Sequence, residues 1–144
     1  MSDSTGFLDT NILVYANDTS FPEKQVRARR LISGLIASGR GCISTQVLAE
    51  FWVTVTRKLT KPLTVELARQ QIALFNGFTI VPVDHAIFLD ALALQERYII
   101  SFWDAQILAT ARRAGCAELF TEDLRKDGAY GEIRVINPFS TIFP

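Results

Sequence analysis

The sequence predicts an α/β fold: a parallel sheet of about four to five strands with helices on both faces. Short apolar runs alternate along the chain with longer segments whose apolar residues have helical spacing. Glycine or proline separates several of these segments, and no repeat or low-complexity tract interrupts them. The chain has 144 residues, of which 49% are hydrophobic, so we expect one domain with a full core over residues 1–144.

The first half of the chain predicts two strands and four helices. Residues 6–8 form a short apolar strand that ends at Asp9, and a short helix is expected over residues 11–16. Apolar residues three and four positions apart predict a helix over residues 22–38. The remaining elements of this half are a strand over residues 41–44 and helices over residues 45–59 and 64–75.

The second half continues the alternation. Residues 78–83 predict a third strand, and residues 84–98 predict a helix. A helix over residues 102–114 precedes two further strands, at residues 118–121 and 133–136. Strands joined through helices pair in parallel, and parallel sheets bind ligands outside the carboxyl ends of their strands. The residues that follow each strand are therefore the candidates for function.

Composition excludes several classes of protein. With one histidine and two cysteines, Cys42 and Cys116, the chain cannot assemble the usual ligands of a zinc site, and we expect both thiols to be reduced and packed. No apolar run approaches the ~18 residues of a membrane span. The first residues lack the basic and apolar regions of a signal peptide. No glycine-rich phosphate-binding loop is present. We therefore expect a cytoplasmic protein with no membrane partner and no nucleotide cofactor.

The net charge is zero, but it is unevenly distributed. Residues 22–70 hold nine Lys and Arg against three acids, so this stretch carries +6 and the remainder −6. A basic stretch facing an acid-rich remainder is typical of a polyanion held over a metal site. Solvated helix faces would give the same count.

Four acidic residues occupy positions that need an explanation. Asp9 ends the first strand, Asp123 follows the fourth, Asp104 opens a helix, and Glu50 lies one to two turns into the helix after the second strand. Each has an ordinary explanation: an N-cap for Asp9, an ion pair with a nearby basic residue for Glu50, a capping box for Asp104 and a surface turn for Asp123. Their joint placement is less ordinary, because the carboxyl ends of parallel strands share one edge of the sheet.

A cluster of four carboxylates at one edge requires protons or a cation. Two like charges about 5 Å apart repel by roughly 3 kcal/mol at an effective dielectric constant near 20. Ligand sets made only of oxygen select Mg²⁺ or Mn²⁺, which bind a few carboxylates together with substrate phosphates. The acidic positions therefore favour hydrolysis of a phosphodiester.

Four segments resemble the acidic motifs of PIN-domain nucleases. Residues 7–13 (FLDTNIL) are similar to the first motif, residues 47–51 (VLAEF) to the second, residues 101–107 (SFWDAQI) to the third and residues 119–124 (LFTEDL) to the fourth. The resemblance covers nearly the whole chain, and the length is most similar to that of VapC-type toxins of toxin–antitoxin pairs. It implies a Mg²⁺- or Mn²⁺-dependent endoribonuclease that cuts tRNA or rRNA. It also implies a homodimer and a small antitoxin that covers the acidic site.

The resemblance assigns roles to individual residues. The acids expected around the metal are Asp9, Glu50, Asp104 and Asp123, of which Asp9 and Asp104 would be the closest ligands. The residues expected to support them are Thr10, Asn11 and Thr121. The uneven charge, rather than the resemblance, gives a further hypothesis: the candidate contacts to RNA phosphates in the basic stretch are Arg27, Arg29, Arg30, Arg57 and Lys58.

Several assignments stay open. Glu122 or Asp127 could take the role given to Asp123, and one or two metal ions could bind. Trp103, beside Asp104, is expected in the core, although it could instead stack on a base. A catalytically inert PIN-like module that binds RNA or protein is an alternative function.

A haloacid-dehalogenase-like phosphatase is a weaker alternative, with Asp9 as its nucleophile. Such enzymes carry a second Asp two positions later, where this chain has Asn11. They also need a catalytic lysine, and Lys126 is the only lysine after Lys61.

Overall fold

The computed structural model describes residues 4–124 and 129–140. Within these ranges, six strands form one sheet in the order β3-β2-β1-β4-β6-β5. Their bounds are β1 (Gly6–Leu8), β2 (Gly41–Ser44), β3 (Thr79–Val81), β4 (Glu118–Phe120), β5 (Ala129–Tyr130) and β6 (Ile133–Ile136). All neighbouring strands pair in parallel except β5, which is antiparallel to β6. The predicted class is confirmed, and β5 escaped prediction because two residues show no periodicity.

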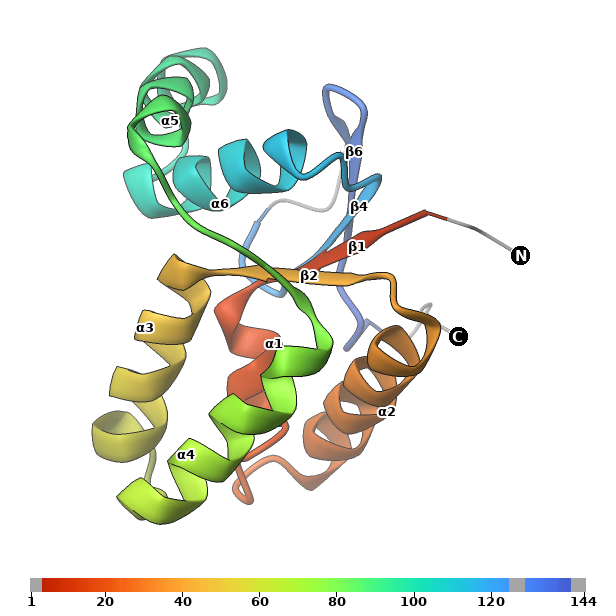
Figure 1. Ribbon diagram of the computed structural model, residues 1–144, viewed down its shortest axis with the longest axis vertical. Coiled ribbons are helices and arrows are strands. Elements are labelled where there is room, and N and C mark those ends of the chain that lie inside the picture. The colour runs from red at the N-terminus through yellow and green to blue at the C-terminus, as the bar shows by residue number, and fades with distance from the viewer. Residues whose placement is uncertain (1–3, 125–128, 141–144) are drawn as a thin grey trace.

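Helices cover both faces of the sheet, as predicted. In Figure 1, α1, α2 and α4 lie below the strands, whereas α5 and α6 lie above them. The bounds are α1 (Thr10–Tyr15), α2 (Pro22–Ser38), α3 (Thr45–Val53), α4 (Val65–Leu74), α5 (His85–Tyr98) and α6 (Phe102–Arg113). Within the described ranges, no helix has the length and apolar character needed to cross a membrane.

The core lies on both sides of the central strands. Phe7, Leu8 and Leu119 are fully buried in β1 and β4. Helix α6 is buried along seven consecutive residues, from Ala105 to Ala111, because it packs against both α5 and the sheet. The thiols of Cys42 and Cys116 are buried and form no disulfide.

The helix predicted over residues 45–59 changes its geometry before it ends. After α3 the chain forms one π-helical turn, η1 (Thr54–Lys58), which closes with a hydrogen bond from the Leu59 N–H to the Thr54 carbonyl at 3.2 Å. A π turn accommodates one more residue than an α turn and therefore changes which side chains face a neighbouring surface. Such turns are frequent at functional sites.

Candidate active site

Asp9 lies at the carboxyl end of β1, where it caps α1. One carboxylate oxygen accepts the Thr10 N–H at 2.7 Å, and the other accepts the Thr121 hydroxyl at 2.8 Å. Only 5% of the residue is exposed. Burial raises the Asp9 pKa from 3.8 to about 7, against the lowering effect of the two hydrogen bonds, and the charges of Asp123 and Asp104 raise it further. The cap predicted at Asp9 is present, but it does not account for so buried a carboxylate.

Glu50 is held by a hydroxyl rather than by a basic side chain. The Thr10 hydroxyl donates to one Glu50 oxygen at 2.6 Å, and the Gln46 amide approaches the other at 3.4 Å. In the described part of the chain, Glu50 forms no ion pair with Arg57 or Lys58. The ion pair considered as an ordinary explanation for Glu50 is therefore wrong. Glu50 is instead hydrogen-bonded to Thr10, the residue that follows Asp9.

Asp104 stands in the first turn of α6 and faces the same space. Its N–H donates to the Ser101 hydroxyl at 3.1 Å, so Ser101 is the predicted N-cap. Burial raises the Asp104 pKa, and the charges of Asp123 and Glu50 raise it further. Asp104 thus lies in the first turn of α6, which Ser101 caps, and is also a member of the acidic group.

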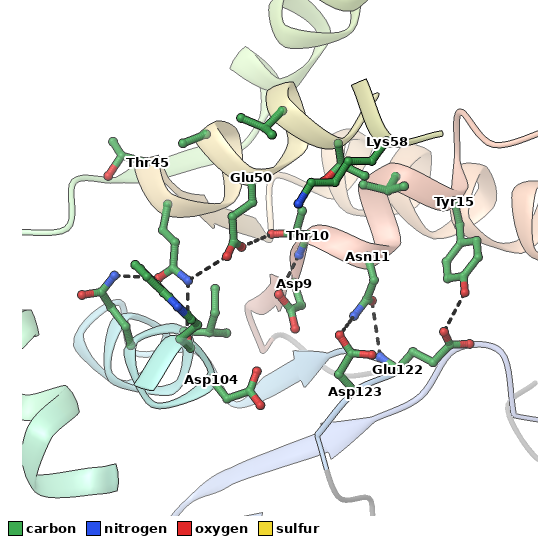
Figure 2. A pocket seen from close by; sticks show the side chains of 18 of the residues that line it. Asp9, Thr10, Asn11, Tyr15, Thr45, Glu50, Lys58, Asp104, Glu122 and Asp123 are labelled. Atoms are coloured by element: carbon green, nitrogen blue, oxygen red, sulfur yellow. Dashed lines mark hydrogen bonds between the residues drawn. The ribbon is translucent and has the colours of Figure 1, made fainter. Parts of the chain in front are cut away.

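Asp123 follows β4 and is oriented by Asn11. The Asn11 amide donates to Asp123 at 3.0 Å, and the Thr121 hydroxyl accepts the Asp123 N–H at 3.1 Å. All three residues expected to support the acids, Thr10, Asn11 and Thr121, therefore contact an acid directly. Figure 2 shows Asp9, Asn11, Glu50, Asp104 and Asp123 close together; they come from the end of β1, from α1, α3 and α6, and from the segment after β4.

Glu122, the neighbour of Asp123, has different partners. It accepts hydrogen bonds from the Tyr15 hydroxyl, at 2.8 Å, and from the Lys24 ammonium, with which it forms an ion pair. Its charge is therefore compensated, whereas the charge of Asp123 acts on Asp9 and Asp104. This difference favours Asp123 over Glu122 as the fourth acid. Asp127, the other alternative, lies outside the described residues.

The four acids line one cavity of about 900 Å³, shown in Figure 2. Among the described residues, no three carboxylate, imidazole or thiol groups lie close enough together, as placed, to hold an ion. The carboxylates nevertheless act on one another electrostatically, and within the described ranges no cationic side chain is bonded to the buried Asp9. A buried acid surrounded by other acids is stabilised by a divalent cation, and an all-oxygen donor set fits Mg²⁺ or Mn²⁺.

Two glutamines of the site were missed by the sequence analysis. The amide of Gln106, which is 7% exposed, donates to Gln46 at 2.9 Å, and the Gln46 amide points to both Glu50 and the Trp103 carbonyl at 3.4 Å. This chain of amides links α6 to α3. The contact between Gln46 and Glu50 could have been predicted, because residues four positions apart on a helix are neighbours.

The expectation that Trp103 lies in the core is wrong. The residue is 59% exposed and lines the cavity. Its neighbour Phe102 is the half-buried ring, packed against Phe88 at 5.6 Å between ring centres. Two adjacent helical residues point in directions about 100° apart, so only one of them can face α5.

The five candidate RNA contacts differ in their surroundings. Lys58 lines the acidic cavity. Arg27 donates to the carbonyls of Pro138 and Ser140, and Arg29 donates to the carbonyl of Ala16 at 2.8 Å, so both are engaged in holding backbone. Arg30 and Arg57 are exposed.

Removing the Thr10 hydroxyl is expected to weaken binding of Mn²⁺. Thr10→Val keeps the shape of the side chain but leaves Glu50 without its 2.6 Å hydrogen bond. Losing a group that orients a ligand typically costs 10–100-fold in metal affinity, so we expect roughly that rise in the Kd for Mn²⁺, measured by calorimetry. Thr10→Ser, which retains the hydroxyl, is the control. Equal affinities for Thr10→Val and wild type would show that Glu50 needs no orientation by Thr10.

Comparison with known proteins places these motifs in a family. A family model described as PIN domain matches residues 6–130. The fold is similar to a chain of a toxin–antitoxin complex from Klebsiella pneumoniae, with a TM-score of 0.70 and 22% identity over 94% of this chain and 98% of that chain. No curated protein matches the sequence.

Two further solved structures have the same fold. Mycobacterium tuberculosis VapC20, described as a sarcin-ricin loop cleaving toxin, matches with a TM-score of 0.64 and 22% identity over 83% of this chain and 92% of its own. VapBC2 from Rickettsia felis, bound to a DNA fragment from its promoter, matches with a TM-score of 0.64 and 20% identity over 92% of this chain and 98% of that chain. At these identities the likeness shows the fold.

Proposed function

The chain belongs to the PIN domain family, and we propose that it is a metal-dependent endoribonuclease that acts as the toxin of a toxin–antitoxin pair. The observation that carries the proposal is the convergence of Asp9, Glu50, Asp104 and Asp123 on one cavity, where the buried Asp9 has acidic neighbours and, in the described part of the chain, no bonded cation. The structural likeness to toxin–antitoxin proteins, one of them described as cleaving the sarcin-ricin loop, supports RNA as the substrate.

The four acids would hold Mg²⁺ or Mn²⁺, with Asp9 and Asp104 as the closest ligands. When bound, such an ion lowers the pKa of a bound water and neutralises charge that develops on phosphate. The chain's own contribution is orientation. Thr121 and the Thr10 N–H fix the two oxygens of Asp9, and the Thr10 hydroxyl fixes Glu50. Asn11 fixes Asp123, which with Glu50 would act on the ion directly or through water.

The partners follow from the same proposal. The substrate is tRNA or rRNA, and a small antitoxin inhibits the enzyme by covering the acidic cavity. The active form is a homodimer, and it works in the cytoplasm. The candidate RNA contacts outside the acids are the basic residues Arg27, Arg29, Arg30, Arg57 and Lys58.

The proposal is tested by cleavage of a labelled total-RNA pool with Mn²⁺, with Mg²⁺ or with EDTA. The control is Asp104→Asn purified in the same way, because contaminating ribonuclease is the main artefact. We expect cleavage by wild type with either metal and none with EDTA or with the variant. Equal cleavage by both preparations, or cleavage that EDTA does not stop, would identify a contaminating ribonuclease. No cleavage by the folded wild type with either metal would contradict a carboxylate–metal nuclease.

Binding of Mn²⁺ separates a nuclease from an inert module of the same fold. An ion that binds only the folded protein at 100 times its Kd stabilises it by ~2.7 kcal/mol. For a chain of this length we expect the Tm to rise by roughly 5–10 °C. The shift should disappear in Asp9→Asn. Thermal unfolding followed by circular dichroism measures it, and an unchanged Tm at millimolar Mn²⁺ would favour the inert module.

A further inference from the structure

The indole of Trp103 is exposed at the cavity and does not pack in the core. Trp103 is 59% exposed and lines the cavity immediately before Asp104 in α6. The ring of Phe102 contacts the Trp103 indole edge to face, with 5.1 Å between ring centres and 77° between planes. The backbone carbonyl of Trp103 accepts from the Gln46 amide at 3.4 Å. Phe102 therefore orients the indole from one side, and the exposed side of the indole can pack against a ligand.

A basic side chain without an ion pair in the described ranges, that of Lys58, also lines the cavity. Among its lining residues, all of which belong to the described part of the chain, Lys58 is the one basic side chain, and it forms no ion pair. It is placed there by the π-helical turn η1. The carboxylates that line the same cavity are Asp9, Asp18, Glu50, Asp104, Glu122 and Asp123. A flexible ammonium in such surroundings is available to an anionic group of a ligand.

We infer that Trp103 and Lys58 form a nucleotide subsite, in which the indole stacks on an unpaired base of the RNA and the ammonium binds a phosphate of the same single-stranded segment. This inference rests on the proposed function and names the substrate form that the site selects. An aromatic face and a point positive charge beside one cavity match the two parts of a nucleotide, since ring faces stack on bases and basic groups track the backbone.

The exposed indole in the lining of the cavity favours a single strand over a duplex. A duplex stacks its bases inside and presents no free base face to an indole, whereas loops and ends can splay a base outward. About 900 Å³ is within the range of pockets that enclose a small ligand. Phe21 and Val53, 47% and 44% exposed, add apolar wall to the same cavity.

The emission of Trp103 gives a direct test in the absence of metal. The chain has two tryptophans, so Trp52→Phe leaves Trp103 as the only tryptophan, whose emission can be excited selectively over that of tyrosine. The probe is a short single-stranded oligoribonucleotide, titrated in EDTA so that no cleavage occurs, and the comparison is the same sequence as a duplex. We expect the single strand to quench the emission and the duplex to leave it unchanged.

Substitutions separate the two parts of the subsite. By anisotropy of a labelled single strand, Trp103→Ala is expected to raise the Kd about tenfold, while Trp103→Phe, which keeps a ring, stays near wild type. The logarithm of the association constant falls linearly with the logarithm of the salt concentration. Lys58→Met should make this slope less steep by about 0.7, the value for one phosphate contact on a single strand. Lys61→Met, an exposed lysine outside the cavity lining, is the matched control and should leave the slope unchanged.

The outcomes distinguish this subsite from the proposed function. Unchanged Kd and salt slope in the variants of an enzyme that binds and cuts RNA would overturn the subsite and leave the nuclease standing. RNA that binds without changing Trp103 emission would show that the indole does not stack on a base, and would also overturn it. A wild-type protein that neither binds nor cuts RNA would overturn both.

Discussion

Asp9→Asn is expected to lower the rate of RNA cleavage at least about 1000-fold, equivalent to about 4 kcal/mol of transition-state stabilisation. The amide fits the volume of the carboxyl group, but it carries no charge for a divalent ion, and its NH₂ cannot accept the Thr121 hydroxyl as the Asp9 oxygen does at 2.8 Å. Single-turnover cleavage in Mn²⁺ measures the loss.

A matched control for this substitution lies on α5. Asp90 pairs with Arg113 at 3.1 Å and does not line the acidic cavity. Asp90→Asn makes the same chemical change and should leave the cleavage rate within a few-fold of wild type. If Asp9→Asn retained a tenth of the wild-type rate, Asp9 would not be a ligand of the ion.

The metal-free protein is expected to lose stability as the pH rises from about 4 to about 7. The Asp9 pKa is 3.8 in its ordinary state and about 7 in the fold, where burial penalises the charged form. Between these values the folded state binds more protons than the unfolded state, so the free energy of unfolding falls with rising pH. The full difference corresponds to about 4 kcal/mol. The raised pKa of Asp104 acts in the same direction.

Comparison with Asp9→Asn isolates the contribution of this one group. Denaturant unfolding in EDTA, measured from pH 5 to pH 8, gives the free energy of unfolding of each protein. We expect the variant to become progressively more stable relative to wild type as the pH rises, because its neutral side chain resembles the protonated acid. Parallel curves for the two proteins would show that Asp9 does not titrate in this range.

The two expectations for Asp9 belong together. A carboxylate whose burial destabilises the empty protein at neutral pH is the same group that a divalent ion would neutralise. Burial of Asp9 therefore lowers the stability of the metal-free protein and at the same time provides a ligand for the ion, a compromise common at functional sites.

The sequence carried most of the fold because the signals were local. Helical spacing of apolar residues placed α2 at residues 22–38, the bounds the structure has, and the apolar run at Gly6–Leu8 placed β1. The change to η1 within the helix predicted over residues 45–59 was not visible, since the apolar spacing continues through that turn. The seven buried residues of α6 likewise show no one-sided pattern, because both sides of that helix are covered.

The sequence by itself determined the fold class and the positions of the four acids, because strand ends and helix starts can be found from local periodicity. Only the tertiary structure decided the partners of those acids. Thr10 reaches Glu50 across 40 positions and Thr121 reaches Asp9 across 112, while Lys24 compensates Glu122 rather than Asp123. It also decided that Trp103 faces the cavity and that Lys58 enters it. Such contacts depend on how whole elements pack, and packing joins segments whose separation along the chain leaves no periodic signal.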